Sequence, residues 1–392
     1  MRTILLFIAG ALATSCAVSD TASDEPTYHS YVQTLLPFIV DDDQNWYLLD
    51  TGTPRTQVLP HVLGMPDDTF REMELPEWDV AALNPGYPPL IVSSVLPPLA
   101  FMEQVQLGGI IGLDLLREQR MLTFEPRMGR LIYGPPESLL FDVGPALDAP
   151  ASIYGGGRTC LVEGQCFNYD ASRFIVEVEV EGVVINALVD TGTTYVMTTP
   201  SFLSQLPARD DRVVLSYERE IPTTYSRFAN FRLGEAEMQD VVFVLNERLG
   251  EAFARLHVET GIRVDMLVGH SFLEYFATTF DFERERLRLY PYHNADHVNL
   301  SDFIGHGVQF ELEDECFRVS SVAITHIDQL ALGDCVVAIA EFPPTSEALP
   351  PLNDFLRNLR YGDVFDVQVR VDSGDIERRT LAMIDLLPPL ND

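Results

Sequence analysis

Two short apolar runs in this chain end in the same polar tripeptide. Trp46-Tyr47-Leu48-Leu49 leads into Asp50-Thr51-Gly52, and Ile185-Asn186-Ala187-Leu188-Val189 leads into Asp190-Thr191-Gly192. Short apolar runs that stop at Asp and Gly predict buried strands ending in turns. The hydrophobic pattern therefore predicts two equivalent strand–turn units.

Each tripeptide is followed at a distance by a second apolar element that ends in glycine. These elements are Ile110-Ile111-Gly112 and Leu267-Val268-Gly269. The residues after them also align, with Leu122-Thr123-Phe124-Glu125 in the first copy and Thr279-Phe280-Asp281-Phe282-Glu283 in the second. One Asp-Thr-Gly alone would be weak evidence. Two copies with the same downstream element indicate an internal repeat.

This repeat resembles the aspartic proteases, and the short retropepsin-like type more than the long pepsin type. The resemblance extends from about residue 37 to residue 292. It implies a mainly β fold with two retropepsin/pepsin-like β lobes related by pseudo-two-fold symmetry. We expect the first lobe at residues 30–150 and the second at 151–297, with the two aspartates meeting between them.

The chemistry of this family explains why two aspartates are needed. Two carboxylates a few ångströms apart share one proton, because both cannot ionise cheaply. The ionised carboxylate takes a proton from water, and the protonated one polarises the peptide carbonyl. Asp50 and Asp190 are therefore predicted as the catalytic pair of an aspartic-type endopeptidase, a hydrolase that needs no cofactor and no metal. Asp and Gly also favour ordinary turns, but the duplication argues against that alternative.

The resemblance assigns supporting roles to the residues beside each aspartate. Those residues are Thr51, Gly52, Thr53, Thr191, Gly192 and Thr193. Glycine lets the backbone turn tightly and approach its partner closely. In this family the middle threonines hydrogen-bond across the lobe interface, and the hydroxyls after the glycines bond to the carboxylates.

Two departures from the family pattern stand close to these motifs. Pro54 and Arg55 follow Thr53, where the family usually continues with small or apolar residues. The second copy reads Gly269-His270-Ser271 where the first reads Gly112-Leu113-Asp114. We expect the Pro54-Arg55 pair to alter the floor of the cleft and neither change to touch the aspartates.

The hairpins that close over substrate in this family are harder to place. In the first lobe the hairpin would lie between Phe70 and Pro98, a stretch interrupted by several prolines. In the second lobe residues 216–231 form the better candidate. Tyr217 and Tyr225 are then either substrate-facing aromatics or plain strand residues.

Residues 298–392 differ in pattern from both copies and resemble a PDZ domain of the bacterial protease-associated type. The turn Leu332-Gly333-Asp334 before an apolar strand carries most of this resemblance. It implies a small PDZ-like α+β domain that binds a C-terminal peptide as an added strand. The alternative is a closed groove that only packs on the protease. The peptide-binding loop would comprise Ile304, Gly305, His306, Gly307 and Val308.

The first residues form a targeting segment. Arg2, an apolar run and the small residues Ala13-Thr14-Ser15 lead to Cys16, which is the layout of a secretory signal peptide over residues 1–16. The junction resembles a bacterial lipobox, which implies lipidation of Cys16 and makes the protein a lipoprotein; soluble secretion is the alternative. Residues 17–29 would be a flexible tether. We therefore expect an exported protein of the bacterial cell envelope, an outer-membrane lipoprotein facing the periplasm or the exterior.

The net charge of the chain limits the kinds of partner that it can bind. The 392 residues include 59 acidic and 26 basic ones, for a net charge of −33. Such a chain repels nucleic acid, so we expect none as a partner. The expected partners are a peptide or protein substrate, a C-terminal peptide on the PDZ-like domain, and a membrane reached only through the lipid anchor.

Export permits disulfide bonds. The short spacing between Cys160 and Cys166 predicts a disulfide that closes a small loop before the second lobe. Cys316 and Cys335 could form a second disulfide or remain free buried thiols.

Two competing functions remain open at this point, one of them a structural envelope protein that uses the fold only as a scaffold. The chain could be a catalytically weak or inactive peptide-binding envelope lipoprotein, in which the cleft captures peptides without cutting them.

Overall fold

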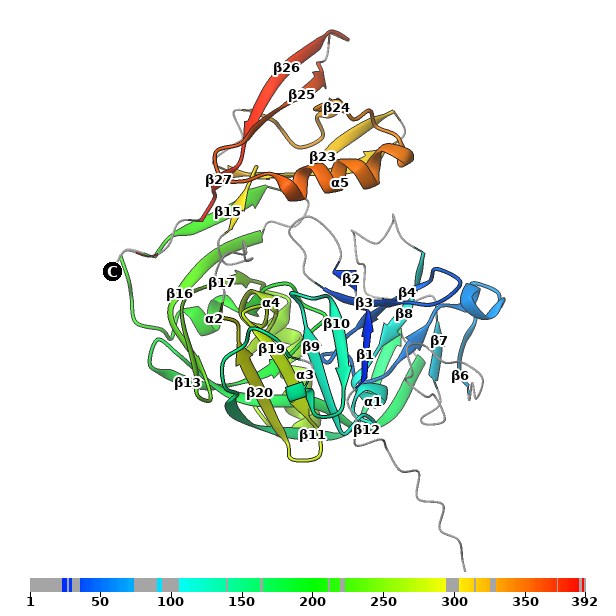
Figure 1. Cartoon of the computed structure of the whole chain (residues 1–392), viewed down its shortest axis with the longest axis vertical. Coiled ribbons are helices and arrows are strands. Elements are labelled where there is room, and N and C mark those ends of the chain that lie inside the picture. The colour runs from blue at the N-terminus through cyan, green and yellow to red at the C-terminus, as the bar shows by residue number, and fades with distance from the viewer. Residues whose placement is uncertain are drawn as a thin grey trace, which may run out of the picture.

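The computed structural model describes residues 23–26, 28–29, 36–73, 90–93, 106–138, 140–162, 165–210, 212–218, 223–293, 303–313, 315–324, 329–371, 373–387 and 390. In this part of the chain strands predominate, and the helices between them are short. The prediction of a mainly β fold is confirmed. The two repeats form a broad body, and the C-terminal strands lie above it (Figure 1).

The first repeat places the strand before Asp50 beside the strand before Gly112. β4 (Trp46–Leu49) runs parallel to β8 (Leu107–Ile111), and β5 (Gln57–Val58) pairs antiparallel with β8 on its other side. Apolar side chains of β4 and β8 are buried, as their sequence predicts. The other elements here are β2 (Tyr28–His29), β3 (Pro37–Val40), η1 (Pro60–Leu63), β6 (Phe70–Met73), β7 (Leu90–Ser93) and α1 (Leu113–Leu116).

The second repeat has the same pairing. β13 (Val183–Val189) runs parallel to β18 (Met266–Val268), and β14 (Val196–Thr198) pairs antiparallel with β18. The duplication seen in the sequence is therefore also a duplication of strand topology. The other elements here are α2 (Pro200–Leu203), β15 (Val214–Glu218), β16 (Thr223–Leu233), β17 (Ala236–Leu245), α3 (Leu249–Thr260) and α4 (His270–Leu273).

A sheet shared by both repeats joins them. β9 (Met121–Glu125) pairs antiparallel with β19 (Phe276–Asp281), and Thr123 lies opposite Thr279 with the two Oγ1 atoms 2.6 Å apart. These buried threonines occupy equivalent positions in the repeat, and equivalent residues meet when two copies are related by a two-fold axis. The sheet continues through β10 (Arg130–Tyr133) and β1 (Ser23–Pro26) on one side, and through β20 (Arg286–Pro291) and β11 (Leu147–Val162) on the other.

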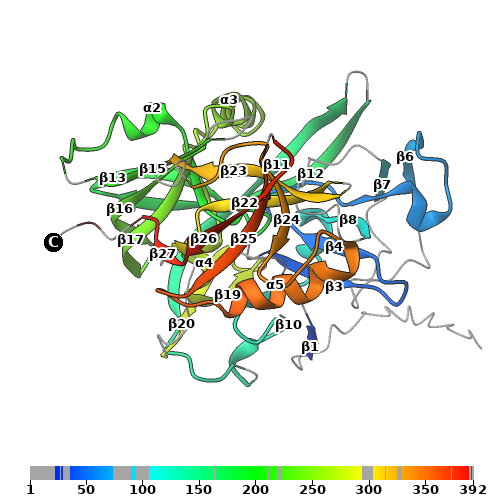
Figure 2. The same cartoon turned by 90° about the horizontal axis from the view of Figure 1, so that it is seen from above.

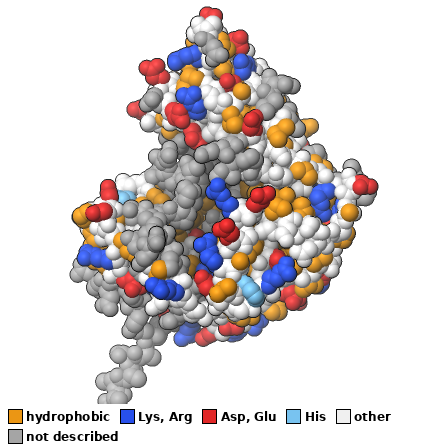
Figure 3. Space-filling view, turned by 180° about the vertical axis from the view of Figure 1, so that it is seen from behind, with side chains coloured by type: hydrophobic (Ala, Val, Ile, Leu, Met, Phe, Trp, Pro, Cys, Tyr) orange, Lys and Arg blue, Asp and Glu red, His pale blue; other side chains and the backbone are white. Residues whose placement is uncertain are grey.

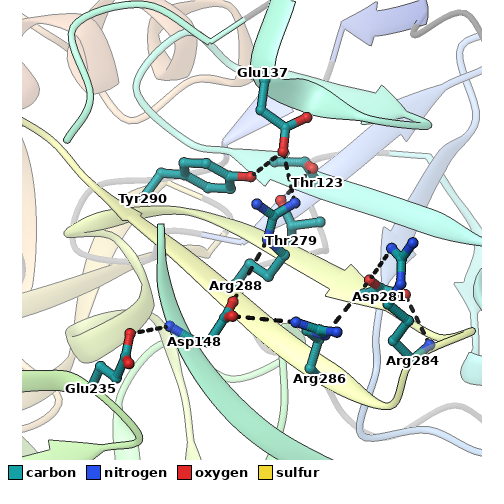
Figure 4. Close-up of polar contacts among 10 residues, drawn as sticks. All are labelled: Thr123, Glu137, Asp148, Glu235, Thr279, Asp281, Arg284, Arg286, Arg288 and Tyr290. Atoms are coloured by element: carbon teal, nitrogen blue, oxygen red, sulfur yellow. Dashed lines mark hydrogen bonds and ion pairs between the residues drawn. The ribbon is translucent and has the colours of Figure 1, made fainter. Parts of the chain in front are cut away.

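A polar network also connects the two repeats at this sheet (Figure 4). Glu137, in the 3-10 turn η3 (Pro136–Ser138), accepts hydrogen bonds from Arg288 Nη1 at 2.7 Å and from the Tyr290 hydroxyl at 2.9 Å. Asp148 pairs with Arg286 at 3.3 Å in the same network. A turn of the first repeat is thus held on strand β20 of the second.

The structure departs from the sequence predictions at the start of the body. Residues 17–29 were expected to be a flexible tether, but Ser23–Pro26 pairs with β10 and Tyr28–His29 pairs with β3. The backbone of this polar segment satisfies the edges of sheets that already exist, which side-chain composition does not reveal. The predicted signal peptide with Cys16 lies outside the described residues.

The predicted boundary between residues 150 and 151 falls inside a strand. β11 begins at Leu147, pairs with β20, and continues as one arm of the hairpin formed with β12 (Gln165–Val180). The pairing register places Cys160 opposite Cys166, and Cys166 is disulfide-bonded. Both facts fit the predicted Cys160–Cys166 link, although the partner of Cys166 stays a prediction.

The C-terminal module, residues 303–387, has an α+β composition. Its helix packs on its sheet through Leu352 and Leu356, in a core shared with Phe317, Val336 and Val367. Its PDZ-like class stays a prediction. Its elements are β21 (Ile304–Gly305), β22 (Val308–Glu313), β23 (Cys316–Ala323), β24 (Cys335–Ile339), η6 (Ser346–Ala348), α5 (Leu349–Asn358), β25 (Val364–Arg370), β26 (Ile376–Ala382) and β27 (Ile384–Asp385).

Cys316 and Cys335 of the module are free thiols. Of the two alternatives raised by the sequence, the structure therefore has the unpaired one. Burial, together with a hydrogen bond that the Cys316 thiol donates to the neighbouring Cys335, raises the pKa of the Cys316 thiol to about 11.

In the part of the chain that the structure describes, we find no helix with the length and apolar content that crossing a membrane requires.

The Glu137 contacts predict a loss of stability in acid. Burial alone would raise the pKa of Glu137, but hydrogen bonds from its backbone, Arg288 and Tyr290, with the Arg288 charge, hold this pKa below its ordinary value. The stabilisation is therefore present above the unfolded-state pKa and is lost as pH falls through the folded-state pKa. Glu137→Gln should lower the free energy of unfolding by less than about 1 kcal/mol at neutral pH, because the carboxylate is half-exposed.

Denaturant titrations at pH 7 and pH 3 measure this difference, which should vanish at the lower pH. Glu283→Gln, at an exposed position in the β19–β20 turn, is the matched control. An equal effect of both substitutions at both pH values would contradict the assigned role of Glu137.

Candidate active site

Both predicted aspartates lie where a buried strand ends beside the apolar-apolar-glycine element. The Asp50 amide donates to the Ile111 carbonyl at 2.9 Å, and the Asp190 amide donates to the Val268 carbonyl at 3.0 Å. The parallel pairs β4–β8 and β13–β18 thus deliver each aspartate to the same place in its copy. The sequence explains this placement locally, because four apolar residues in each run form the strand and Asp-Thr-Gly ends it.

The two tripeptide turns are cross-bonded through their threonines. The Thr51 hydroxyl donates to the Val189 carbonyl at 2.8 Å and accepts from the Thr191 amide at 3.1 Å. Symmetrically, the Thr191 hydroxyl donates to the Leu49 carbonyl at 2.7 Å and accepts from the Thr51 amide at 3.1 Å. Both threonine side chains are buried, so four hydrogen bonds shielded from water hold the turns together.

The glycines permit the carboxyl groups to approach. A Cβ atom on Gly52 would lie 2.5 Å from the Asp190 Cγ, and one on Gly192 would lie 2.6 Å from the Asp50 Cγ. Each carboxyl group therefore packs against the glycine of the opposite turn, and any larger residue would collide with it. The Asp50 and Asp190 carboxyl groups therefore approach each other between the two turns.

The two carboxyl groups have different donors. Asp50 accepts from the Gly52 amide at 2.7 Å, the Thr53 amide at 2.9 Å and the Thr53 hydroxyl at 2.6 Å. Asp190 accepts from the Gly192 amide at 2.9 Å and from the Thr193 hydroxyl at a longer 3.3 Å. Burial, then the charge of Asp50 and the hydrogen bond with it, raise the pKa of Asp190 well above its ordinary value. The shared proton therefore belongs on Asp190, while Asp50 accepts the larger number of hydrogen bonds.

The second glycine of each copy lies directly beneath the turn. A Cβ on Gly112 would lie 2.9 Å from the Thr53 carbonyl oxygen, and one on Gly269 would lie 2.5 Å from the Thr193 carbonyl oxygen. The residues that follow these glycines, Leu113 and His270, donate their amides to the same carbonyls at 2.8 and 3.0 Å. The repeated element thus supports the turn from below.

Arg55, one of the two departures, contacts Asp114, the position at which the second copy has Ser271. Arg55 Nε pairs with the Asp114 carboxylate at 3.3 Å, and both side chains are buried. Asp114 also accepts from the amide and hydroxyl of Thr56 at 2.9 and 2.7 Å. Burial raises the pKa of Asp114 in spite of these donors, so its charge depends on the Arg55 guanidinium.

Arg55 also reaches two elements outside its turn. Its Nη2 pairs with Glu72 of β6 at 3.0 Å, and its Nη1 donates to the Asn168 carbonyl of β12 at 2.5 Å. Arg55 thus links three segments through its contacts, and its effect on the floor of the cleft stays a prediction.

The second copy has a neutral side chain at the position equivalent to Asp114. Ser271 lies two residues after Gly269, as Asp114 lies two residues after Gly112. The Ser271 hydroxyl accepts from the Val196 amide at 2.8 Å and donates to the Val242 carbonyl at 2.7 Å. Both side chains therefore bond the strand that follows the turn. This role was missed from the sequence, although the shared offset from glycine was a usable signal.

The covering hairpins are described only in part. β6 and β7 pair antiparallel in the first repeat, but their connection, residues 74–89, lies outside the described residues. In the second repeat β15 and β16 form the expected hairpin. Tyr217 and Tyr225 are buried in it against Ala323 and Phe303 of the C-terminal module, so the interpretation that they face substrate is wrong. Sequence could not show this, because the covering residues lie about a hundred positions later.

The predicted peptide-binding loop of the module is well defined. Ile304 and Gly305 form β21, which pairs with β27, and Val308 opens β22. Gly307 adopts a φ of 71°, which glycine tolerates without strain. His306 is buried, with its ring 5.3 Å from that of Phe365. Its side chain therefore supports the loop from inside.

Comparison with known families bears on the second repeat. Residues 176–272 match the family model described as "Aspartyl protease". This segment has the features of an aspartyl protease. It contains Asp190 and Gly269, whereas Asp50 lies outside the matched range. The match supports a hydrolase of the aspartic-protease type.

Among solved structures, the chain is similar to Basic 7S globulin from soybean. The identity is 12%, the match covers 72% of this chain and 98% of that chain, and the TM-score is 0.37. No curated protein matches the chain.

The hydrogen bonds between the two turns predict how the replacement of Thr51 changes stability. Thr51→Val leaves the Thr191 amide and the Val189 carbonyl buried without this partner, which costs about 1–3 kcal/mol for each group. Thr51→Ser keeps the hydroxyl and should retain most of the stability. Chemical denaturation of both variants distinguishes the hydroxyl from the lost methyl group, and equal losses would argue against the cross-bond.

The Arg55–Asp114 ion pair predicts that a substitution of Asp114 restores stability lost by a substitution of Arg55. Arg55→Met should destabilise the protein by about 3 kcal/mol, because it leaves the Asp114 carboxylate buried without its counter-ion. Adding Asp114→Ser, which copies the second repeat, should recover much of this loss. Thermal unfolding of the single and double variants at pH 7 measures the rescue. A double variant no more stable than Arg55→Met alone would show that charge is not the cause.

Proposed function

We propose that this chain is an exported aspartic-type endopeptidase in which Asp50 and Asp190 activate one water molecule. The observation that supports this most directly is the packing of each carboxyl group against the glycine of the opposite turn, at the junction of two cross-bonded Asp-Thr-Gly turns. The aspartyl protease match of residues 176–272 supports the same class of reaction.

The donors on each carboxyl group assign the roles. Asp50 accepts three hydrogen bonds and is the base, while Asp190 holds the proton. A water between them loses a proton to Asp50 as its oxygen attacks the peptide carbonyl carbon, and the carbonyl oxygen takes the proton of Asp190. When the tetrahedral intermediate collapses, the C–N bond breaks. The nitrogen then takes the proton from Asp50, and a hydroxyl of the intermediate returns one to Asp190.

The substrate is an extended peptide lying over the two turns. In the first repeat hairpin β6–β7 would cover it. In the second repeat Tyr217 and Tyr225 are packed under the C-terminal module, so they do not contact the peptide. On the face shown in Figure 3, acidic and basic side chains of the described residues lie interspersed, which fits a peptide substrate and gives no support to nucleic acid.

The C-terminal module would bind a peptide C-terminus at residues 304–308, with the peptide adding to β22 as a strand. Among the described residues β22 pairs with β23 alone, so its other edge has the geometry that strand addition needs. The signal peptide and Cys16 would place the protein in the bacterial envelope as an outer-membrane lipoprotein. The disulfide-bonded state of Cys166 fits an oxidising compartment.

Removing either carboxylate tests the reaction. Asp50→Asn and Asp190→Asn should each lower kcat for a peptide library at least about a thousandfold, because proton transfer alone supplies about 10²–10⁴. The parent should retain activity above the pH at which an ordinary carboxyl ionises and lose it as pH rises through the raised pKa of Asp190. A parent that binds peptides without cutting them would favour the peptide-binding alternative.

Asp190→Asn, which should lower activity, is expected to raise stability. Because the pKa of Asp190 is raised by folding, its contribution is most favourable below the unfolded-state pKa and worsens as pH rises. Asp190→Asn should therefore raise the free energy of unfolding at pH 7 by roughly 0.5–2 kcal/mol. Denaturant titration checks this, and no gain at pH 7 would argue against a proton held on Asp190.

A further inference from the structure

Strand pairing joins the C-terminal module to the second repeat. Tyr217 and Glu218 at the end of β15 pair antiparallel with Ala323 and Val322 of β23. They directly precede the connection of hairpin β15–β16 at residues 219–222, so the module attaches next to the tip of that hairpin. Since β23 also pairs with β22 and β24, the sheet of the module continues into the hairpin (Figures 1 and 2).

The far end of the module returns to the same hairpin. The buried Arg227 of β16 donates through Nε and Nη2 to the Leu387 carbonyl at 2.7 and 2.5 Å, and through Nη1 to the Asp240 carbonyl at 2.8 Å. The Leu390 amide donates to the Asp240 carboxylate at 3.0 Å. The module is thus held to the hairpin at two separate places, at β23 and at Leu387, which makes independent movement of the two costly.

An aromatic cluster continues this contact to the turn of Asp190. Phe303, the first residue of the module that the structure describes, has its ring centroid 5.0 Å from that of Tyr225 and 5.7 Å from that of Tyr195. Tyr195 and Tyr225 are 5.2 Å apart and edge-to-face. Tyr195 is the fifth residue after Asp190, and its carbonyl oxygen would lie 2.4 Å from a Cβ on Gly269. Displacing Tyr195 therefore displaces the segment that carries the aspartate.

The equivalent position in the first repeat is also held from outside. Arg55 is the fifth residue after Asp50, and it contacts Glu72 of β6 and the Asn168 carbonyl of β12. Each turn is thus fixed at the same position by a different element.

We propose that the C-terminal module is a positioning element for the Asp190 half of the candidate active site, acting through Phe303 and Tyr195. This inference rests on the proposed function. Among the described residues the contact runs from Phe303 through Tyr195 to the backbone of the turn, so the module would set the orientation of the carboxyl group and not the binding of substrate. Loss of the contact should therefore lower kcat and leave KM nearly unchanged, because small misplacements of reacting groups reduce the rate of the chemical step.

The test compares Phe303→Leu, which removes the ring and keeps the apolar volume, with Phe303→Tyr, which keeps the ring. Val367→Ala is the matched control, because Val367 is fully buried in the core of the module and belongs to a cluster separate from Phe303. Peptide cleavage gives kcat and KM, and hydrogen–deuterium exchange of the intact protein reports on residues 190–196 and 214–226.

We expect Phe303→Leu to lower kcat about tenfold, with KM changed less than threefold, and to speed exchange in both segments about tenfold. Phe303→Tyr should restore both values. Val367→Ala should speed exchange inside the module only. The proposal is overturned if Phe303→Leu leaves exchange at residues 190–196 unchanged, or if Val367→Ala changes kcat as much. If the parent cleaves no peptide, the proposed function fails, and the exchange of residues 190–196 alone decides whether the module positions the turn.

Discussion

Four hydrogen bonds made by the hydroxyls of Thr51 and Thr191 determine what this protein can do. They join two turns that are 140 residues apart in the chain, and both side chains are buried. Each turn supplies a hydroxyl and an amide, and each uses a carbonyl from the strand before the opposite aspartate. Without this arrangement the carboxyl groups would have no reason to meet, since two acidic side chains repel each other once ionised. The glycines, the strands and the shared sheet all serve to bring these two turns together.

The repeats share this core and differ in what surrounds it. The first copy bonds its following strand through a charged pair, Arg55 and Asp114, and the second uses the neutral hydroxyl of Ser271. The carboxyl groups differ as well, because Asp50 accepts more and shorter hydrogen bonds than Asp190. Such asymmetry is useful for acid–base chemistry, in which one group must hold a proton while its twin does not.

The parts of the site that a local pattern encodes could be read from the sequence. A strand that ends in Asp-Thr-Gly, repeated with its downstream glycine, was enough to predict Asp50, Asp190 and the residues beside them, and the structure brings these together. The partners of Arg55 could not be predicted, because its three contacts come from β6, β12 and the helix α1 after Gly112. Tyr217 and Tyr225 were open to two interpretations for the same reason. The strands at residues 23–26 and 28–29 escaped notice because backbone groups, and not their polar side chains, hold them in place.

The hydrogen bond from Arg55 to Asn168 has one more consequence. Asn168 belongs to the long hairpin β11–β12, which precedes the second Asp-Thr-Gly, yet its carbonyl serves the first. An assembly of two identical first halves would therefore lack this acceptor, and one of two second halves would have no arginine to offer it. The two copies are therefore not interchangeable at this contact, because one supplies the donor and the other the acceptor.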